Sequence, residues 1–175
     1  VLYEKAAEEK LPMASTTKIM TALLTLEAAQ AEDRQVKITD EMVRVEGSSM
    51  GLKPGNVVTL TALAQGMLLC SGNDAANAAA IAIAGSTEEF AKLMNSTAKS
   101  FGATNSNFVN PSGLPDENHY TTIYDMYLIF SNAISLESFV AIISSQTHDV
   151  AYTNAQGAAV SKTFKNTCGY LTGAY

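Results

Sequence analysis

Ser15 and Lys18 are the first residues of the chain whose types and spacing could perform chemistry. They lie three positions apart at the start of a predicted helix, so both side chains would occupy one face, about one turn apart. A serine hydroxyl attacks only when a base removes its proton, and a lysine in a dry pocket can act as that base. The helix N-terminus would add N–H groups suited to a developing oxyanion. Alone, however, the pair also fits a capping serine followed by a solvated lysine.

The second candidate motif is Ser71-Gly72-Asn73, which falls in a predicted break between two helices. Small polar residues at such a break often do no more than form a turn. Together with Ser15 and Lys18, however, the triplet fits the serine acyl-transferases that bind penicillin, in which a Ser-x-Asn motif lines the pocket beside the nucleophile. The two motifs therefore predict one catalytic site, assembled from distant parts of the chain.

The elements that must position these motifs follow from apolar periodicity and capping residues. A helix is predicted from Ser15 to Gln30, and a long loop over residues 103–120. Strands near opposite ends of a chain can pair in one sheet, so an α+β fold is expected. The other predicted helices cover residues 40–45, 62–69 after a Thr61 cap, 75–84, 86–100, 122–134 and 135–143, and the predicted strands cover residues 1–3, 36–39, 57–60, 150–153 and 161–167.

Longer segments around the motifs resemble the serine D-alanyl-D-alanine carboxypeptidases, which are low-molecular-weight penicillin-binding proteins of the peptidase S11 type. The likeness covers about residues 1–170, and the chain is identified as a member of this family. It departs at Cys70, where proline is usual. The resembling segments are residues 11–22 around the nucleophile, 47–52 between the first two motifs, 68–76 around the second, and 108–114 with 119–122 ahead of a helix that contains Asp125.

The resemblance implies a β-lactamase/DD-peptidase-like transpeptidase fold, with a helical lobe packed on an antiparallel sheet and residues 1–175 in a single penicillin-binding domain. It implies that Ser15 is the acylated nucleophile, Lys18 its general base and Ser71 a proton relay. Asn73 would bind the substrate amide and help to hold Lys18, with Gly72 beside it in the substrate-binding set.

The reaction implied by the resemblance removes the terminal D-alanine from peptidoglycan pentapeptide stems through an acyl-enzyme. β-Lactams would acylate the same serine. The family acts outside the cytoplasm, in the cell envelope, and the full-length protein would be membrane-associated. No cofactor is implied.

The family's third motif, Lys-Thr-Gly, does not occur in the sequence. In one interpretation the chain is truncated at both ends and the motif lies shortly past Tyr175. In the other, Leu171-Thr172-Gly173 is a degenerate third motif. We favour truncation, because the chain also begins within a predicted strand, and sheet strands need partners. The 175-residue piece alone is then expected to be inactive or nearly so, unless a second chain completes the sheet.

Two other functions compete with this hypothesis. A class A-like β-lactamase shares the first two motif types, but it needs a glutamate that activates the deacylating water, and no Glu-x-x-x-Asn element follows Ser71. A non-catalytic wall-binding protein with a decayed third motif would not need Ser15, Lys18, Ser71 and Asn73, all of which are present.

Composition narrows the remaining classes of function. The net charge is −6 and there is no cluster of lysine and arginine, so nucleic-acid binding is disfavoured. Metal-ligand spacing is absent, so no metal is expected. Cys70 and Cys168 fit either buried thiols or a disulfide, and the sequence does not decide between them. His119 is expected to make a structural hydrogen bond.

Overall fold

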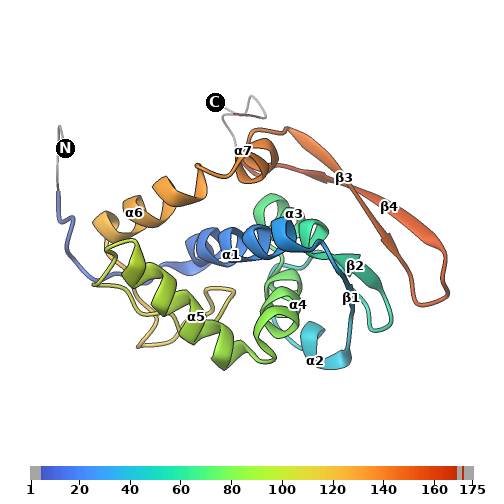
Figure 1. Cartoon of the computed structure of the whole chain (residues 1–175), viewed down its shortest axis with the longest axis horizontal. Helices are drawn as coiled ribbons and strands as arrows, with labels where there is room; N and C mark the ends of the chain where they lie inside the picture. The colour runs from blue at the N-terminus through green and yellow to red at the C-terminus, as the bar shows by residue number, and fades with distance from the viewer. Residues whose placement is uncertain (1–4, 169–170, 172–175) are drawn as a thin grey trace.

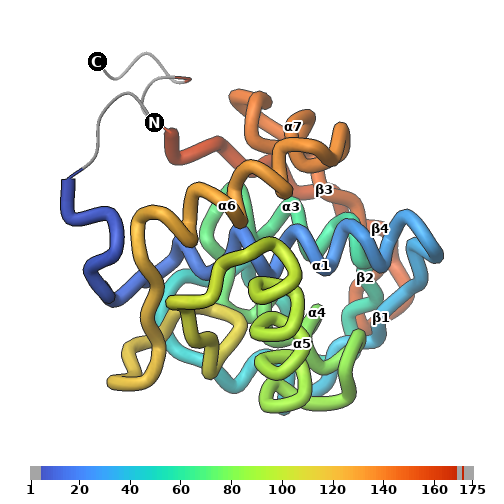
Figure 2. Tube along the Cα trace, turned by 60° about the vertical axis from the view of Figure 1, so that its left-hand side comes forward, coloured from blue at the N-terminus to red at the C-terminus, as the bar shows by residue number. Residues whose placement is uncertain are grey.

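The computed structural model describes residues 5–168 and Leu171 (Figure 1). The strand predicted at residues 1–3 lies outside this part of the chain. A helical region adjoins a sheet at one end of the molecule, and Figure 2 shows the same arrangement from a second direction. The elements in chain order are a 3₁₀ turn, η1 (Ala14–Thr16), and then α1 (Thr17–Ala31), β1 (Gln35–Lys37), α2 (Asp40–Val43), β2 (Val57–Thr59), α3 (Leu60–Cys70), α4 (Asn73–Ala84), α5 (Thr87–Ser100), α6 (Ile123–Ala133), α7 (Glu137–Ile143), β3 (Thr147–Thr153) and β4 (Ala159–Lys165).

The sheet has four strands in the order β1-β2-β3-β4, and every neighbouring pair is antiparallel. β1 and β2 come from the first third of the chain, whereas β3 and β4 form a long hairpin near its end. The two halves join where Val57 pairs with Thr153. The expectation that distant strands share one antiparallel sheet beside a helical lobe is thus confirmed.

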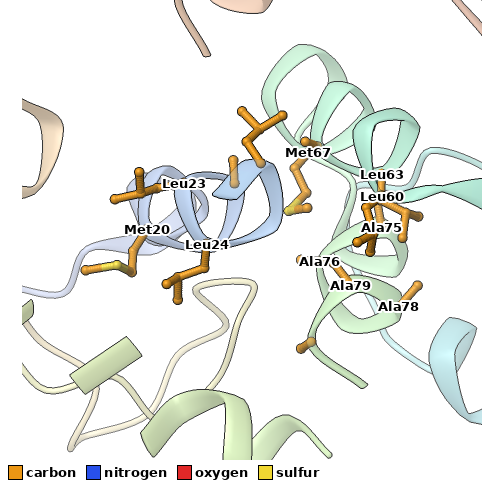
Figure 3. Close-up of a cluster of buried hydrophobic side chains, with 14 of the residues drawn as sticks. Met20, Leu23, Leu24, Leu60, Leu63, Met67, Ala75, Ala76, Ala78 and Ala79 are labelled. Carbon is orange, nitrogen blue, oxygen red and sulfur yellow. The ribbon is translucent and has the colours of Figure 1, made fainter. Parts of the chain in front are cut away.

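Helix α1 is the centre of the helical region and packs against α3, α4, α5, α6 and α7. Its side chains are buried on nearly every face from Thr17 to Leu26, as is typical of an interior helix. Figure 3 shows Met20, Leu23 and Leu24 of α1 in one cluster of buried hydrophobic side chains with residues of α3 and the alanines of α4. Those small alanines let α4 approach closely, so the start of α1 is held inside a packed core.

The helix boundaries around the second motif differ from the predicted ones. The N-cap of α3 is Thr59, whose hydroxyl accepts from Ala62 N at 3.1 Å, so the prediction of Thr61 as the cap was wrong. Leu60 is completely buried, and this burial draws the helix start two residues earlier. Helix α4 begins at Asn73, so the break consists of Ser71 and Gly72 alone.

Within the described part of the chain, no single helix is long and apolar enough to cross a membrane. The pair α6 and α7 meets the length and composition criteria only when taken together, and the two are bent by 107° at their junction.

Candidate active site

The side chains of Ser15, Lys18 and Ser71 meet at one point. Lys18 Nζ lies 3.2 Å from Ser15 Oγ, and the Ser71 hydroxyl donates to Ser15 Oγ at 2.8 Å. Ser15 lies in the 3₁₀ turn η1, Lys18 lies in the first turn of the central helix α1, and Ser71 lies in the break between α3 and α4. The two predicted motifs are therefore brought together, with the Ser15 hydroxyl between a nitrogen base and a second hydroxyl.

Burial changes the acid–base properties of Lys18. The residue is 2% exposed, and its ammonium donates to the backbone carbonyl of Ser112 at 2.6 Å. Desolvation lowers the pKa of Lys18 from 10.5 to about 8, and the nearby Cys70 thiol opposes this effect in part. A lysine with this pKa is uncharged in roughly a tenth of molecules near neutral pH, which gives a usable population of the basic form.

The turn that presents Ser15 has an unusual backbone. Ala14 has φ of 45°, in the left-handed region that residues other than glycine seldom adopt. Gly113, with φ of 86°, packs directly against this turn, and a Cβ built on Gly113 would overlap the carbonyl oxygen of Ala14. Only glycine fits at position 113, and the close contact holds the turn that carries Ser15 in place.

Residues 110–114, which we call the carbonyl loop, reach α1 through backbone oxygens. In addition to the Ser112 carbonyl, the Pro111 carbonyl accepts from Thr21 Oγ1 at 2.7 Å. The loop is folded around Asn110, whose Oδ1 accepts from the backbone N–H groups of Ser112, Gly113 and Leu114 at 3.2, 2.7 and 3.1 Å. Lys18 therefore receives its acceptor from a rigid loop.

His119 ties the next part of this segment to α1. Val109 N donates to Nδ1 at 3.1 Å, so the neutral ring carries its proton on Nε2 and donates it to Thr17 Oγ1 at 2.8 Å. Burial lowers the pKa of His119, which favours this neutral form. The structural hydrogen bond expected for His119 is confirmed.

The rest of the second motif faces a different loop. Asn73 Nδ2 donates to the Glu46 carbonyl at 2.6 Å, and Asn73 N donates to the Ser48 carbonyl at 2.7 Å. The resemblance implied that Asn73 helps to hold Lys18, but the hydrogen bonds of the Lys18 ammonium go to Ser15 and Ser112. Ser112, which holds Lys18 through its backbone, was not among the predicted site residues.

A cleft of about 660 Å³ opens beside the three reactive side chains. Ser15, Lys18 and Ser71 line it, whereas Gly72 and Asn73 are not among its described lining residues. Much of the wall is apolar, from Ile19, Met67, Leu68, Phe130, Phe139 and Ile143, and polar groups come from residues 166–168. Of the candidate degenerate third motif, Thr172 and Gly173 lie outside the described residues.

A serine between a buried lysine and a second serine, on a helical lobe beside an antiparallel sheet, defines the penicillin-recognising class of serine peptidases. The chain belongs to the D-alanyl-D-alanine carboxypeptidase family (peptidase S11), whose model matches residues 1–173.

Individual relatives agree with this assignment. The chain is 42% identical over 144 residues to the D-alanyl-D-alanine carboxypeptidase DacF of Bacillus subtilis, covering 79% of this chain and 36% of that protein. It is 42% identical over 142 residues to DacC of Escherichia coli, covering 74% and 35%. The chain therefore spans about a third of the length of these relatives.

Among solved structures, the Streptomyces K15 DD-transpeptidase superposes with a TM-score of 0.87 at 31% identity, covering 98% of this chain and 70% of that one. The fold and the pairing of helical lobe and sheet are thus those of the DD-peptidases.

Proposed function

We propose that the protein is a serine D-Ala-D-Ala carboxypeptidase that removes the terminal D-alanine from peptidoglycan stem peptides. The observation that carries the proposal is the position of Ser15 Oγ, within 3.2 Å of the buried Lys18 ammonium and 2.8 Å of the Ser71 hydroxyl. Residues 1–175 would all belong to a single catalytic domain, and the names of the relatives support the choice of substrate.

In the proposed reaction, uncharged Lys18 takes the proton from Ser15 as its Oγ attacks the carbonyl carbon of the penultimate D-alanine. The backbone N–H of Ser15, at the start of the central helix, would donate to the oxyanion. When the peptide bond breaks, Ser71 donates its proton to the departing amine of the terminal D-alanine and recovers a proton from protonated Lys18, which becomes uncharged again. Uncharged Lys18 then takes a proton from the water that attacks the Ser15 ester, and this proton passes to Ser15 Oγ as the ester bond breaks and the shortened stem leaves as a carboxylate. A β-lactam would form the same ester through opening of its ring.

The proposal also extends to binding and to place of action. Asn73 and Gly72 would flank the substrate once the peptide lies beside Ser71, with the Asn73 side chain meeting a backbone amide of the stem. Because peptidoglycan lies in the cell envelope, the protein would act on the outer side of the cytoplasmic membrane, and the full-length protein would be membrane-associated.

The test is acylation by a fluorescent penicillin, with mass spectrometry to locate the adduct and Ser15→Ala as the control. We expect one adduct, on Ser15, and none in Ser15→Ala. An adduct elsewhere, or none in the full-length protein, would contradict the proposal.

The fate of the adduct separates the competing enzymes. An ester that persists for minutes to hours supports a carboxypeptidase, and release within seconds would indicate a β-lactamase. Release of D-alanine from a peptide that ends in D-Ala-D-Ala completes the assignment, whereas acylation without release of D-alanine would contradict it.

A further inference from the structure

Asp74 is a buried carboxylate that accepts hydrogen bonds from a neighbouring loop. It is 3% exposed and lies in the first turn of α4, one residue after Asn73. Its two oxygens accept from Ser49 Oγ at 2.7 Å and from the backbone N–H groups of Met50, Gly51 and Leu52 at 2.8, 3.0 and 2.9 Å. These four donors from the loop, together with Ala75 N at 2.9 Å, make a charge-assisted network on one carboxylate that is far stronger than a single neutral hydrogen bond.

Residues 46–52, which we call the clamp loop, are held from three directions. Asn73 donates hydrogen bonds to the Glu46 and Ser48 carbonyls, and Asp74 accepts from the N–H groups of residues 50–52. From β4, the Lys162 ammonium donates to the Met50 carbonyl at 2.7 Å. The loop is thereby attached both to the second catalytic motif and to the sheet.

The clamp loop in turn braces Ser71. Ser71 has φ of 57°, a left-handed conformation that costs a non-glycine residue about 1–2 kcal/mol and persists only when its surroundings enforce it. Met50 packs against both sides of the break between α3 and α4 that contains Ser71. Its side chain packs against Gly66 in α3, where a Cβ would overlap it, and a Cβ on Gly72 would lie 3.0 Å from Met50 N.

We propose that Asp74 is a positioning residue for the acylation reaction, acting through Met50 and Asn73 to hold Ser71 Oγ in place beside Ser15. Asp74 touches neither Ser15 nor Lys18 and does not line the cleft among the described residues. Its effect is therefore geometric: with the clamp loop released, Ser71 can leave its strained conformation, and the 2.8 Å contact with Ser15 Oγ is lost in part of the population. This inference rests on the proposed function.

Asp125 provides a matched control. It is 1% exposed, lies in the first turn of α6, and holds a loop by accepting from Asn105 N and Ser106 Oγ, both at 2.7 Å. Asp74→Asn and Asp125→Asn make the same chemical change in similar settings, and only the first adjoins the catalytic motif.

The experiment uses the full-length protein and measures the second-order rate constant for acylation by fluorescent penicillin, the melting temperature, and backbone amide exchange. We expect Asp74→Asn to lower the rate constant about tenfold or more and to speed exchange at Met50, Gly51 and Leu52. Asp125→Asn should lower the melting temperature to a similar extent and keep the rate constant within about threefold. Ser49→Ala, which removes one of the four donors, should lie between wild type and Asp74→Asn in both rate and exchange.

The pH profile separates positioning from electrostatics. Asp74→Asn should lower acylation by the same factor at every pH and leave the apparent pKa of the profile where it is. The inference would be overturned if Asp74→Asn shifted the apparent pKa or kept the wild-type acylation rate. It would also be overturned if the acylation rate fell in proportion to the melting temperature in both Asp74→Asn and Asp125→Asn. If wild type is not acylated at all, the proposed function fails, and amide exchange still decides whether Asp74 holds the loop.

Discussion

Two loops flank Ser15, the proposed nucleophile, and they hold the site through different contacts. The carbonyl loop (110–114) offers acceptors, and its Ser112 oxygen binds the Lys18 ammonium directly. The clamp loop (46–52) is bound through four donors to Asp74 and through carbonyls that accept from Asn73 and Lys162, and it reaches the site only through Ser71 and Asn73. The carbonyl loop therefore contacts Lys18, the proposed base, directly, whereas the clamp loop acts on the geometry of Ser71, the proposed proton relay.

Substitutions in the two loops should therefore have different effects on acylation. A change at the carbonyl loop or at Lys18 should alter protonation, pH dependence and stability together. A change at the clamp loop should reduce the rate of acylation with little effect on pH dependence.

Replacement of the base should have the largest effect. Lys18→Met should lower acylation by about 10³-fold, because the Ser15 proton then has no acceptor. In wild type, the acylation rate should rise with pH toward an apparent pKa of about 8, which is the lowered pKa of Lys18. Lys92→Met, a change on the exposed surface of α5, is the control and should leave both rate and profile unchanged. A normal rate in Lys18→Met would assign the base elsewhere.

The same burial predicts how stability varies with pH. Since the pKa of Lys18 is lowered from 10.5 to about 8, the folded chain releases this proton first as pH rises. Between these values the unfolded state binds more protons, so the free energy of unfolding due to Lys18 rises with pH. Chemical denaturation of wild type and Lys18→Met across this range should show the rise in wild type alone. Parallel curves for the two proteins would contradict the lowered pKa.

Gly113→Ala should damage both the fold and the site. The new Cβ would overlap the Ala14 carbonyl, which is backbone and cannot rotate away, so the carbonyl loop and the Ser15 turn must separate. We expect a loss of several kcal/mol in the free energy of unfolding, in the upper range for single substitutions, and acylation near the detection limit.

Gly157→Ala is the matched control for Gly113→Ala, because Gly157 has a similar φ of 82° but nothing within 4 Å of its added Cβ. It should cost only about 1 kcal/mol, the strain of the backbone itself. Equal losses in the two variants would mean that the contact with Ala14 does not hold the nucleophile.

Gly47→Ala should separate rate from stability on the clamp loop. Its Cβ would lie 2.7 Å from Asn73 Nδ2, the end of a side chain that can move. We expect a stability loss close to that of Gly157→Ala, together with an acylation rate lower by about tenfold as Asn73 is displaced. An unchanged rate would show that the orientation of Asn73 does not limit acylation.

Much of this site could be predicted from the sequence, since the chemistry of Ser15, Lys18 and Ser71 resides in side chains at recognisable spacing. The pairing of early and late strands could also be predicted. The hydrogen bond from Lys18 to the Ser112 carbonyl could not be predicted, because every residue type has a backbone carbonyl. The resemblance marked residues 108–114 without giving them a role. The cap of α3 was misplaced because Thr59 and Thr61 have equal capping chemistry, and only the burial of Leu60 distinguishes them.

His119 should produce the smallest of these effects, a sensitivity to acid. Burial lowers the pKa of its ring, and the Val109 N–H occupies the nitrogen that a second proton would need. As pH falls below the ordinary value of 6.5, the unfolded chain is protonated first, so the free energy of unfolding decreases until the folded ring titrates as well. His119→Asn keeps an acceptor for Val109 N and cannot titrate, so its stability should change less with pH below 6.5. Thr17→Val removes the hydroxyl partner at a cost of about 1 kcal/mol and should retain the wild-type dependence. If His119→Asn loses stability in acid as steeply as wild type, the acid sensitivity belongs to another group, and the link from the segment after the carbonyl loop to α1 is purely structural.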